Sequence, residues 1–386
     1  MKRVMIVAGE ISGDLFGADL LRELRKLAPD LSVYGVGGPM MVEHGLELLY
    51  DSSGWGTIGV VEALKKLPTL YFAYRRLLSL LDSRRPDLLV LVDYPGLNMR
   101  LARRAKNRGI PVVYHFPPSK WVMDPALVAD AARHIDFVAA PFVSTAKVYR
   151  DAGSNVAFVG NPLLDIVKPT VPAAEFRAEF SLARSRTISI LPGSRNREIQ
   201  YLLPLLLESV RGLAAAGVEA DFLMPLTSSL FRRNGFDRAF FERAVARSGA
   251  DVRILVDRTY DALAVSDLAI IASGTATLEA ALLGCPMVII YQVSKVTEFF
   301  ARRFSALPEH FGLPNLILSR RVVPELLQEE VTPDRMANEC RILLDDPERL
   351  GRMRSDLKRV ARYLGRPGAS ERVAKRIVSM LESLQI

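Results

Sequence analysis

The sequence has little cysteine and no residue spacing typical of a metal site. Only two cysteines occur among 386 residues, Cys285 and Cys340, and neither has a cysteine or histidine nearby at metal-ligand spacing. We therefore expect no zinc site and a reducing compartment. The apolar run Val4–Ala8 is too short for the core of a signal peptide, which predicts a cytoplasmic protein.

Long uncharged runs are also scarce. The stretch Leu268–Val293 has Glu279 as its only charged residue and is long enough to cross a bilayer. Turn-forming residues at Ser273–Thr275 and Gly284–Pro286 divide it, which predicts a strand, a helix and a strand buried in an α/β sheet. A composition that is 49% hydrophobic and 24% charged excludes a disordered chain.

The positive charge is concentrated in one region. The formal net charge is +8, and Val60–Arg108 holds eleven basic residues against four acidic ones. A single basic residue usually belongs to a solvated helix face, but this excess indicates an anionic partner: a lipid headgroup, a phosphorylated substrate or a nucleic acid. No motif for binding RNA or DNA accompanies it, so we expect no nucleic-acid partner.

Short β-branched runs alternate with helical patterns, which predicts parallel sheets covered by helices on both faces. The expected strands are Val4–Ala8, Leu31–Gly35, Leu88–Asp93, Pro111–His115, Phe137–Ala140, Val156–Gly160, Thr187–Leu191, Asp221–Met224, Val252–Val256, Leu268–Ala272 and Met287–Ile290. The periodicity lapses between Asn161 and Pro172, which marks a linker. A final helix from Glu371 to about Leu384 would take Ser370 as its N-cap.

The fold class that follows is α/β, with two doubly wound Rossmann-like domains that face a central cleft. We place the domains at residues 1–165 and 166–366. Residues 367–386 form a C-terminal helix that is expected to pack back on the N-terminal domain. In such sheets ligands bind beyond the carboxyl ends of the strands, so the informative residues should directly follow strands.

Two strand ends in the second half carry residues suited to a nucleotide. They are Gly193, Ser194 and Arg195 after the first strand, and Ser273, Gly274, Thr275 and Glu279 after the other. Glycine lets a ligand approach the backbone, and a helix start with a nearby arginine favours phosphate. Glu279 lies one turn into its helix, where it is either a carboxylate that accepts hydrogen bonds from a ribose or one favoured by the helix dipole.

Asp93 ends a buried strand of the first half and precedes Pro95-Gly96. Two roles fit Asp93 equally well at that position: a general base that faces a ligand, and the cap of an ordinary turn. The loop after the first strand carries Glu10, Ser12, Gly13 and Asp14. It has neither the G-x-G-x-x-G pattern nor a Walker lysine, so the residues support neither dinucleotide binding nor ATP hydrolysis. We expect His115, at another strand end, to be a satisfied, partly buried histidine.

Taken together and in order, these motifs resemble the lipid-A-disaccharide synthase family of inverting glycosyltransferases with the two-Rossmann-domain (GT-B) fold. The resemblance covers nearly the whole chain. The matching segments are Ala8–Asp14 with Gly17-Ala18, Gly35–Met40, Gly56–Glu62, Pro86-Asp87 with Asp93, Pro95 and Asn98, Phe158–Pro162, Leu191–Arg195, Ala272–Ala276 with Leu278-Glu279, Leu313–Leu316 and Val323–Gln328.

The resemblance implies a hexosyltransferase that takes an acylated glucosamine from a UDP donor. The acceptor it implies is an acylated glucosamine phosphate of the lipid X type, and the products are a β-1,6 disaccharide and UDP. Asp93 matches the family's base, Glu10, Ser12, Gly13 and Asp14 the acceptor side, and Arg195, the Ser273–Glu279 segment and Asn315 the nucleotide side. We expect no cofactor and no catalytic metal, since no Asp-x-Asp motif stands near these loops. The expected location is the inner face of the cytoplasmic membrane, bound peripherally.

Two departures from the family pattern lie on the acceptor side. Gly96 stands where the family has an acidic residue, and Pro117–Met123 lacks one aromatic residue and contains Lys120. Three alternatives remain open from the sequence: a GT-B enzyme with another lipid or sugar acceptor, a UDP-sugar epimerase, and a basic binding protein without turnover. The sequence leaves the oligomeric state open, and a homodimer is one state that is compatible with it.

Overall fold

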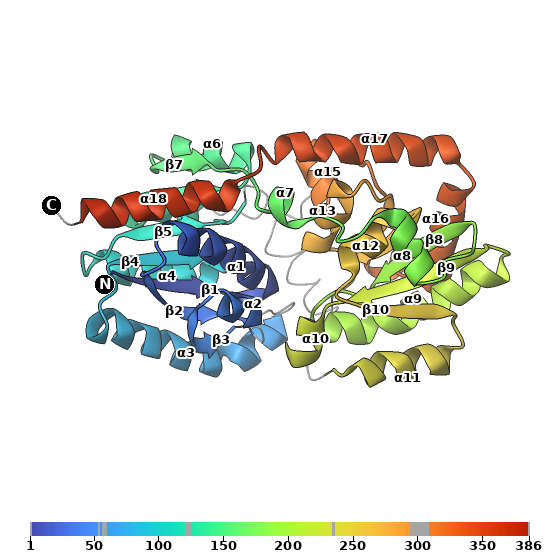
Figure 1. The fold of residues 1–386 in the computed structure, drawn as a ribbon, viewed down its shortest axis with the longest axis horizontal. Helices are drawn as coiled ribbons and strands as arrows, with labels where there is room; N and C mark the ends of the chain where they lie inside the picture. The colour runs from blue at the N-terminus through green and yellow to red at the C-terminus, as the bar shows by residue number, and fades with distance from the viewer. Residues whose placement is uncertain are drawn as a thin grey trace. The chain divides into compact units, whose positions relative to one another are not determined.

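The computed structural model describes residues 2–52, 55, 60–119, 125–233, 236–293 and 309–384. The described chain divides into two α/β units (Figure 1). The first unit contains nearly all of the chain up to Ile166 together with the segment from Tyr363 onward, and the second spans Val167–Arg362. The α/β fold class with two parallel-sheet domains is therefore confirmed.

The first unit is built on a parallel sheet with the strand order β3-β2-β1-β4-β5-β6-β7 among its described residues. Its elements are β1 (Arg3–Ala8), α1 (Glu10–Leu27), β2 (Ser32–Gly37), α2 (Pro39–Glu43), β3 (Glu47–Asp51), α3 (Val60–Ser83), β4 (Leu88–Val92), α4 (Pro95–Lys106), β5 (Val112–His115), α5 (Pro125–His134), β6 (Phe137–Ala140), α6 (Val143–Asp151), β7 (Val156–Phe158), α7 (Leu163–Ile166) and α18 (Ala369–Ser383).

The second unit has a parallel sheet with the order β10-β9-β8-β11-β12-β13 in its described part. Its elements are α8 (Ala173–Glu179), β8 (Arg186–Leu191), α9 (Asn196–Ala215), β9 (Ala220–Leu226), α10 (Ser228–Arg233), α11 (Arg238–Ser248), β10 (Val252–Val256), α12 (Thr259–Val265), β11 (Leu268–Ala272), α13 (Thr275–Leu282), β12 (Met287–Tyr291), α15 (Leu313–Leu318), β13 (Glu325–Leu327), the 3₁₀ turn η1 (Gln328–Glu330), α16 (Pro333–Leu344) and α17 (Pro347–Tyr363).

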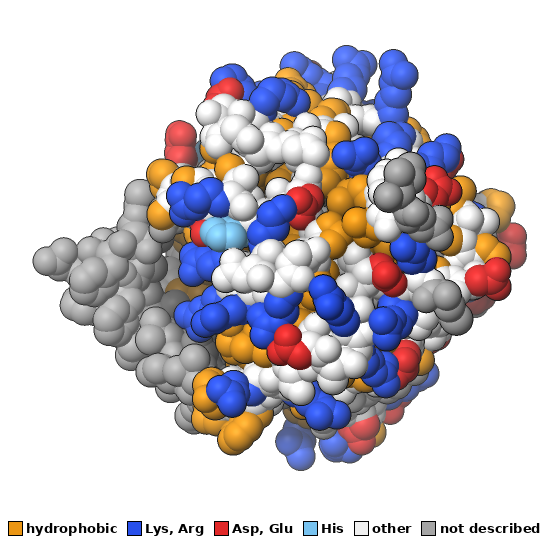
Figure 2. Space-filling model, turned by 90° about the vertical axis from the view of Figure 1, so that its left-hand side faces the viewer, with side chains coloured by type: hydrophobic (Ala, Val, Ile, Leu, Met, Phe, Trp, Pro, Cys, Tyr) orange, Lys and Arg blue, Asp and Glu red, His pale blue; other side chains and the backbone are white. Residues whose placement is uncertain are grey.

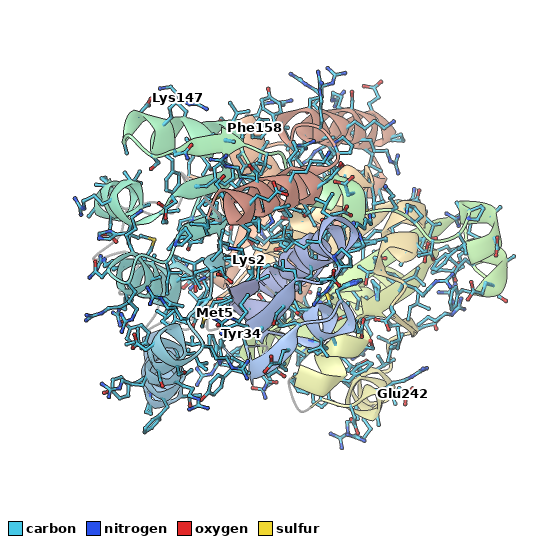
Figure 3. The ribbon with its side chains drawn as sticks, turned by 60° about the vertical axis from the view of Figure 1, so that its left-hand side comes forward. Lys2, Met5, Tyr34, Lys147, Phe158 and Glu242 are labelled. Atoms are coloured by element: carbon cyan, nitrogen blue, oxygen red, sulfur yellow. The ribbon has the colours of Figure 1, made fainter. Side chains whose placement is uncertain are left out.

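Burial on both faces explains why the strands read as nearly continuous apolar runs. Every residue of β4 is fully buried, as is every residue of β1 after Arg3. Alternate residues of the first sheet pack against α3, α4 and α5. Met5 of β1 and Tyr34 of β2 are register partners in this core and are labelled in Figure 3.

The strand order reverses at one place in each sheet. The chain winds outward from β1 to β2 and β3, then returns to place β4 on the other side of β1, and β8 and β11 have the same relation in the second unit. Ligands of open parallel sheets bind beyond the carboxyl ends of the strands at such a reversal. We therefore expect ligands at the loops after β1 and β4 in the first unit, and at the loops after β8 and β11 in the second.

All of the expected strands are present, and the described residues include two more strands, β3 and β13, that were not predicted. β3 has exposed polar residues at both ends, and β13 is only three residues long, so neither gives a clear periodic signal. The predicted cap at Ser370 is wrong. Gly368 is the N-cap of α18, with a φ of 86° that favours glycine, and Ser370 is buried in the first turn.

The segment after Tyr363 returns to the first unit, where α18 packs along α1. The backbone N–H of Gly368 donates to Asp165 Oδ2 at 2.6 Å. The guanidinium of Arg372 donates twice to the carbonyl of Val159, at 3.0 and 2.8 Å. The end of the chain is thus fixed to the region that leaves the first sheet.

The described helices include none that is both long and apolar enough to cross a membrane. Cys285 and Cys340 are buried and unbonded to each other. Burial raises the pKa of the Cys285 thiol to about 12, and that of Cys340 also lies well above its ordinary value. Both thiols are therefore protonated at neutral pH and act as core side chains.

Candidate functional site

The turn after β8 is closed by a carboxylate of the chain itself. Glu198 Oε2 accepts hydrogen bonds from the backbone N–H groups of Ser194 and Arg195, at 3.0 and 3.4 Å. Gly193 has a φ of 96°, and a Cβ there would lie 2.1 Å from Glu198 Oε2, so only glycine fits. The expected contact between these amides and a phosphate is therefore not available while Glu198 holds them.

The Arg195 side chain remains the charged group of this turn. Burial raises the pKa of Glu198, and the charge of Arg195 opposes that rise. The same arginine also acts on the pKa of Tyr291 at the end of β12, where burial is again the larger cause of the upward shift. A cationic group therefore lies among the carboxyl ends of β8 and β12.

The turn after β11 is open at its glycine. A Cβ on Gly274 would meet nothing within 4 Å, and the residue is exposed. Thr277 closes the first turn of α13 by donating from its hydroxyl to the Gly274 carbonyl at 2.8 Å. Ser273 Oγ donates to the carbonyl of Phe311, also at 2.8 Å. This open helix start at the end of a buried strand has the geometry that accommodates a diphosphate.

Glu279 is the group of this site whose pKa is shifted to near neutrality. Burial raises its pKa to about 7, and a hydrogen bond from the Tyr260 hydroxyl at 3.3 Å opposes the rise. A carboxyl group with a pKa near neutrality, one helical turn after an open glycine, marks a candidate ligand contact. At neutral pH about half of the Glu279 carboxyl groups carry a proton.

Asn315, predicted on the nucleotide side, is held by the chain itself. It is fully buried, and its amide donates to the Val323 carbonyl and to Glu325 Oε1, at 2.9 and 2.7 Å. Its Oδ1 accepts from the backbone N–H groups of Val322 and Val323, at 2.7 and 3.0 Å. All of its hydrogen-bonding groups are used by the chain, so Asn315 shapes this loop. Its assignment to the nucleotide side stays a prediction.

Glu325 and Phe311 were not predicted as site residues. Glu325 is buried and accepts from the backbone N–H groups of Phe311 and Gly312, at 2.9 and 2.8 Å. The Phe311 ring stacks on Tyr291 with 5.0 Å between ring centroids. Phe311 is 38 positions from Ser273, so no local pattern links them. The one available signal is a single carboxylate inside the apolar run Val322–Leu327.

In the first unit, Asp93 lies at the carboxyl end of β4 with its carboxylate half-buried. Its Oδ1 accepts from the backbone N–H of Tyr94 at 2.8 Å, and its Oδ2 accepts from the Ser12 hydroxyl at 3.2 Å. Its carbonyl accepts from the side chains of Asn98 and Tyr114, at 2.7 and 2.9 Å. Both the side chain and the backbone of Asp93 are thus fixed in place.

Backbone strain concentrates around Asp93. Asp93 and Tyr94 have φ angles of 51° and 50°, and Glu10 after β1 and Phe116 after β5 have φ angles of 64° and 59°. These residues follow three neighbouring strands of one sheet. Left-handed conformations cost about 1–3 kcal/mol each for non-glycine residues and cluster at functional sites. The strain therefore identifies the β1-β4-β5 edge as the candidate site of this unit.

Tyr94 forms the wall of this site. Its ring covers Gly9, where a Cβ would lie 2.3 Å from the ring, and it packs on Trp55 with 5.8 Å between centroids. Burial raises the pKa of Tyr94 to about 12, and the charge of Glu10 adds to the rise. Ser12, Glu10 and Tyr94 thus come together around Asp93.

Asp14 is fully buried and has a structural role. Its Oδ1 accepts from the backbone N–H groups of Gly38 and Met41, at 2.8 and 3.1 Å, which fixes the start of α2. Gly13 packs on Ala8 at the end of β1. Asp14 therefore connects α1 to the start of α2, and Gly13 lies against the end of β1. The assignment of both residues to the acceptor side stays a prediction.

His115 differs from the expectation of a satisfied histidine. It is buried, neither ring nitrogen has a hydrogen-bond partner among the described residues, and burial lowers its pKa to about 4. A neutral, unpartnered imidazole beside the strained Phe116 adds a further unusual feature to this edge.

Some expected features lie outside the described residues. They are Lys120–Met123 and the segment from Gly56 to Gly59. Within the described ranges, no three or more His, Cys, Asp or Glu side chains are grouped so as to hold a metal ion.

Comparison with known proteins assigns the chain to a family. The model of the family described as lipid-A-disaccharide synthetase matches residues 4–378. The lipid-A-disaccharide synthase of Geobacter sulfurreducens is 42% identical over 380 residues, with 98% of this chain and 97% of that protein covered. The protein of the same name from Geobacter metallireducens is 42% identical over 381 residues, with the same coverage.

A solved structure gives the fold relationship. The UDP-GlcNAc 2-epimerase from Neisseria meningitidis, bound to UDP-GlcNAc, aligns with a TM-score of 0.64 and covers 98% of this chain and 100% of its own. Its sequence identity is 14%, so the similarity concerns the fold and not the reaction. The family match over nearly the whole chain decides between transferase and epimerase: this chain belongs to the lipid-A-disaccharide synthase family of glycosyltransferases.

Proposed function

We propose that the chain transfers an acylated glucosamine from a UDP donor to the primary hydroxyl of an acylated glucosamine phosphate, with Asp93 as the base. The observation that carries this proposal is the fixed, half-buried Asp93 carboxylate at the strained β1-β4-β5 edge. Acceptor activation is assigned to the first unit and donor binding to the second. The family membership supports the disaccharide product.

The donor is proposed to bind at the ends of β8 and β11. Arg195 neutralises the diphosphate, and the open turn at Ser273, Gly274 and Thr275 receives it at the start of α13. Glu279 accepts hydrogen bonds from the ribose. Gly193, Ser194 and Asn315 hold the loops around these groups. The UDP-GlcNAc bound in the structurally similar Neisseria meningitidis enzyme supports a UDP-sugar on this fold.

The reaction is a single displacement with inversion. The acceptor hydroxyl has a pKa far above 7, so transfer of its proton to Asp93 as the new C–O bond forms lowers the barrier. The electron pair of the breaking C–O bond leaves with the β-phosphate of UDP. Arg195 stabilises the charge that develops there. The Ser12 hydroxyl orients one oxygen of Asp93, at 3.2 Å.

The test is the variant Asp93→Asn, which keeps the shape and loses the proton acceptor. We expect turnover to fall by about two orders of magnitude or more, since general base catalysis contributes about 10²–10⁴-fold. Binding of UDP, measured by calorimetry, should not change. Mass spectrometry of the product formed from UDP-acyl-glucosamine and a panel of acylated and non-acylated acceptors identifies the acceptor.

A matched control separates the base from its supports. Ser12→Ala removes the hydroxyl that donates to Asp93 and leaves the carboxylate, so its effect on turnover should be clearly smaller than that of Asp93→Asn. Turnover near the wild-type rate in Asp93→Asn, with the product confirmed, would show that another group takes the proton.

We also propose peripheral attachment to an anionic membrane through α3. Most of the described apolar side chains of this helix, those from Leu70 onward, pack on the core, including Ala73, Leu77 and Leu81. Tyr71 and Phe72 do not, being 57% and 69% exposed. Basic residues share that exposed surface, one helical turn further along, at Arg75 and Arg76. Aromatic and basic side chains together suit an interfacial helix.

The excess of positive charge is smaller than the sequence indicates. Arg84, Arg103 and Lys106 form ion pairs with Glu47, Asp130 and Asp136, all of which lie outside Val60–Arg108. Figure 2 shows Lys and Arg side chains spread over one face of the molecule with acidic ones among them. Attraction to an anionic surface is about 1 kcal/mol per basic residue close to it and is screened by salt.

Vesicle sedimentation tests this attachment. Replacing Arg75 and Arg76 with Gln, and Tyr71 and Phe72 with Ser, should each reduce binding to vesicles that contain phosphatidylglycerol, and binding should weaken as salt rises. The side chains of Lys65 and Lys66 lie outside the described set, so the variants avoid them. Equal partition onto neutral and anionic vesicles would contradict the proposal.

A further inference from the structure

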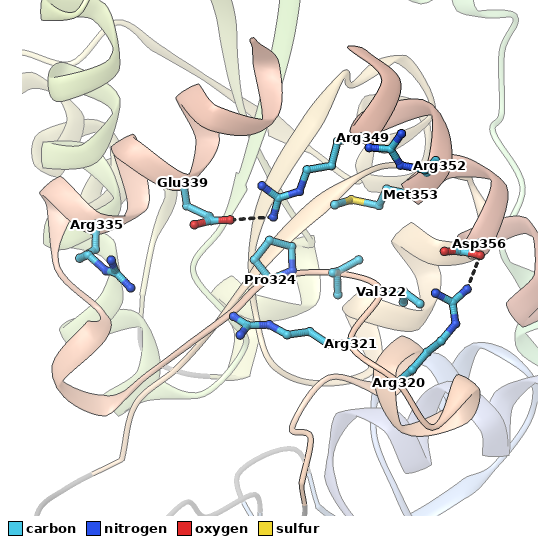
Figure 4. Close-up of a pocket in the computed structure, with 11 residues that line it drawn as sticks. Arg320, Arg321, Val322, Pro324, Arg335, Glu339, Arg349, Arg352, Met353 and Asp356 are labelled. Carbon is cyan, nitrogen blue, oxygen red and sulfur yellow. Dashed lines mark hydrogen bonds and ion pairs between the residues drawn. The ribbon is translucent and has the colours of Figure 1, made fainter. Parts of the chain in front are cut away.

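The second unit contains a cavity of about 590 Å³ lined by five arginines. They are Arg320, Arg321, Arg335, Arg349 and Arg352 (Figure 4). Two carboxylates, Glu339 and Asp356, complete its charged lining, which leaves an excess of three positive charges. Its volume lies within the range of pockets that bind small molecules.

Helical spacing brings these charges together. Arg335 and Glu339 are four positions apart on α16, and Arg349, Arg352 and Asp356 lie on one face of α17. Arg320 and Arg321 come from the segment between α15 and β13. Three separate parts of the chain therefore direct arginines to one cavity, as Figure 4 shows.

The two carboxylates are already engaged. Glu339 pairs with Arg349 at 3.1 Å, and Asp356 pairs with Arg320. Each is 20% exposed, so these pairs form part of the cavity wall. These two ion pairs involve two of the five arginines and both carboxylates of the lining.

The other three arginines have weak or uncharged partners. Arg321 donates to the carbonyl of Glu325 at 3.1 Å and forms no ion pair with a described residue. Arg335 and Arg352 pair with the exposed carboxylates of Glu330 and Glu348, at 3.5 and 3.3 Å. Glu330 and Glu348 lie outside the lining, and exposed pairs of this kind contribute little to stability, so Arg335 and Arg352 can exchange these partners for a bound anion. Arg321 has no carboxylate partner among the described residues, so the lining keeps a positive excess.

Part of the cavity lining is apolar. Val323 and Met353 are buried there, and Val322 and Pro324 lie beside them. Arginines and apolar side chains in one lining fit a ligand that has both an anionic group and a carbon skeleton. Guanidinium groups match phosphate oxygens with paired hydrogen bonds, which makes phosphate the best-suited anion.

The cavity is separate from the donor residues of the same unit. Its segment 320–324 precedes β13, and Pro324 accepts a hydrogen bond from the N–H of Ile289 in β12. The cavity therefore lies toward the amino ends of the parallel strands β12 and β13. Arg195, Ser273 and Glu279 follow the carboxyl ends of β8 and β11, and none of them lines the cavity.

We propose that this cavity is a second anion site, which binds a phosphate group attached to an organic molecule. Two sources carry that chemistry, a soluble phosphorylated metabolite and the headgroup of an anionic lipid. The site does not depend on the proposed transfer reaction, since it uses none of the residues assigned to the donor or to the base.

Calorimetry with inorganic pyrophosphate tests the site. The titration is done with and without saturating UDP, so that binding to the donor residues is recognised by its loss when UDP is present. The test variant is Arg335→Gln with Arg352→Gln, two exposed arginines whose replacement leaves both wall pairs intact. The matched control is Arg238→Gln with Arg243→Gln on α11, which are similarly exposed and are also paired with carboxylates.

We expect the wild type and the control to bind pyrophosphate in the presence of UDP, and the test variant to bind at least roughly tenfold more weakly. No binding by the wild type, loss of binding with UDP, or an equal loss in the control would overturn the proposal. Arg321→Gln should weaken binding in the same way and checks that the double variant has not acted through the fold. Sedimentation with vesicles of phosphatidylglycerol in phosphatidylcholine then assigns the source, since only a lipid headgroup makes vesicle binding depend on Arg335 and Arg352.

Discussion

If Glu279 accepts hydrogen bonds from the ribose, donor binding must depend on pH in a way set by its raised pKa. Burial raises that pKa to about 7 in the protein without donor. Ribose hydroxyls donate to the carboxylate and favour its charged form. Donor binding should therefore release a proton from Glu279, and the affinity should rise with pH until Glu279 is ionised.

The magnitude follows from the pKa. At pH 6 about nine-tenths of the Glu279 carboxyl groups are protonated, and at pH 8 about one-tenth are. If the bound state holds Glu279 ionised throughout, the dissociation constant should fall about tenfold between pH 6 and pH 8, equivalent to about 1.4 kcal/mol.

The assay is calorimetric titration with UDP-N-acetylglucosamine in two buffers of different ionisation enthalpy, which counts the protons released. This donor is preferable to UDP because the terminal phosphate of UDP has a pKa of about 6 and would add its own pH dependence. The control is Glu279→Gln, which cannot titrate. Tyr260→Phe removes the hydrogen bond that lowers the pKa of Glu279, so it should move the pH dependence upward.

The same pKa makes a prediction for stability without donor. Because the folded-state pKa lies above the ordinary glutamate value of 4.5, Glu279 stabilises the fold fully below pH 4.5 and loses that contribution as pH rises through 7. The wild type should therefore lose melting temperature relative to Glu279→Gln between pH 5 and pH 8. An identical pH dependence of donor binding in the wild type and in Glu279→Gln would refute the reasoning.

Three further outcomes follow from the site. Arg195→Ala should weaken UDP binding by about 1–3 kcal/mol in calorimetry, and unchanged affinity would place the diphosphate elsewhere. Gly193→Ala should lower the melting temperature, because its Cβ would lie 2.1 Å from Glu198 Oε2 at a φ of 96°, whereas Gly274→Ala, with no neighbour within 4 Å, should not. Excess EDTA should leave turnover intact, and abolished turnover that returns on adding a divalent metal would contradict the metal-independent mechanism.

The sequence predicted correctly which polar residues follow the buried strands. Asp93, Ser273 and Glu279 all lie at or just beyond a carboxyl end, because burial on both faces makes those strands visible as apolar runs. The sequence could not show what those residues contact. Glu198, which occupies the helix start offered to phosphate, and the left-handed backbone at Asp93 and Tyr94 are products of the folded geometry.

The hydrogen-bond partners of the buried site residues are the part of the site that the sequence could not predict. Asn315 looked like a ligand residue because its motif matches, yet four hydrogen bonds to Val322, Val323 and Glu325 use its amide completely. Glu325 lies on a strand too short to show a period, and its partner Phe311 lies 14 positions away in the loop before α15. Such pairings depend on which strands become neighbours.

The return of the chain to the first unit has a consequence for how the protein is made. Its last helix, α18, packs on α1, and the two are separated by the whole second unit. During synthesis from the N-terminus the first sheet emerges early, while the surface of α1 that α18 covers stays bare until Ala369–Ser383 has left the ribosome. The second unit, Val167–Arg362, is continuous and can complete its core sooner. The half of the molecule that is translated first is therefore the one that finishes folding last.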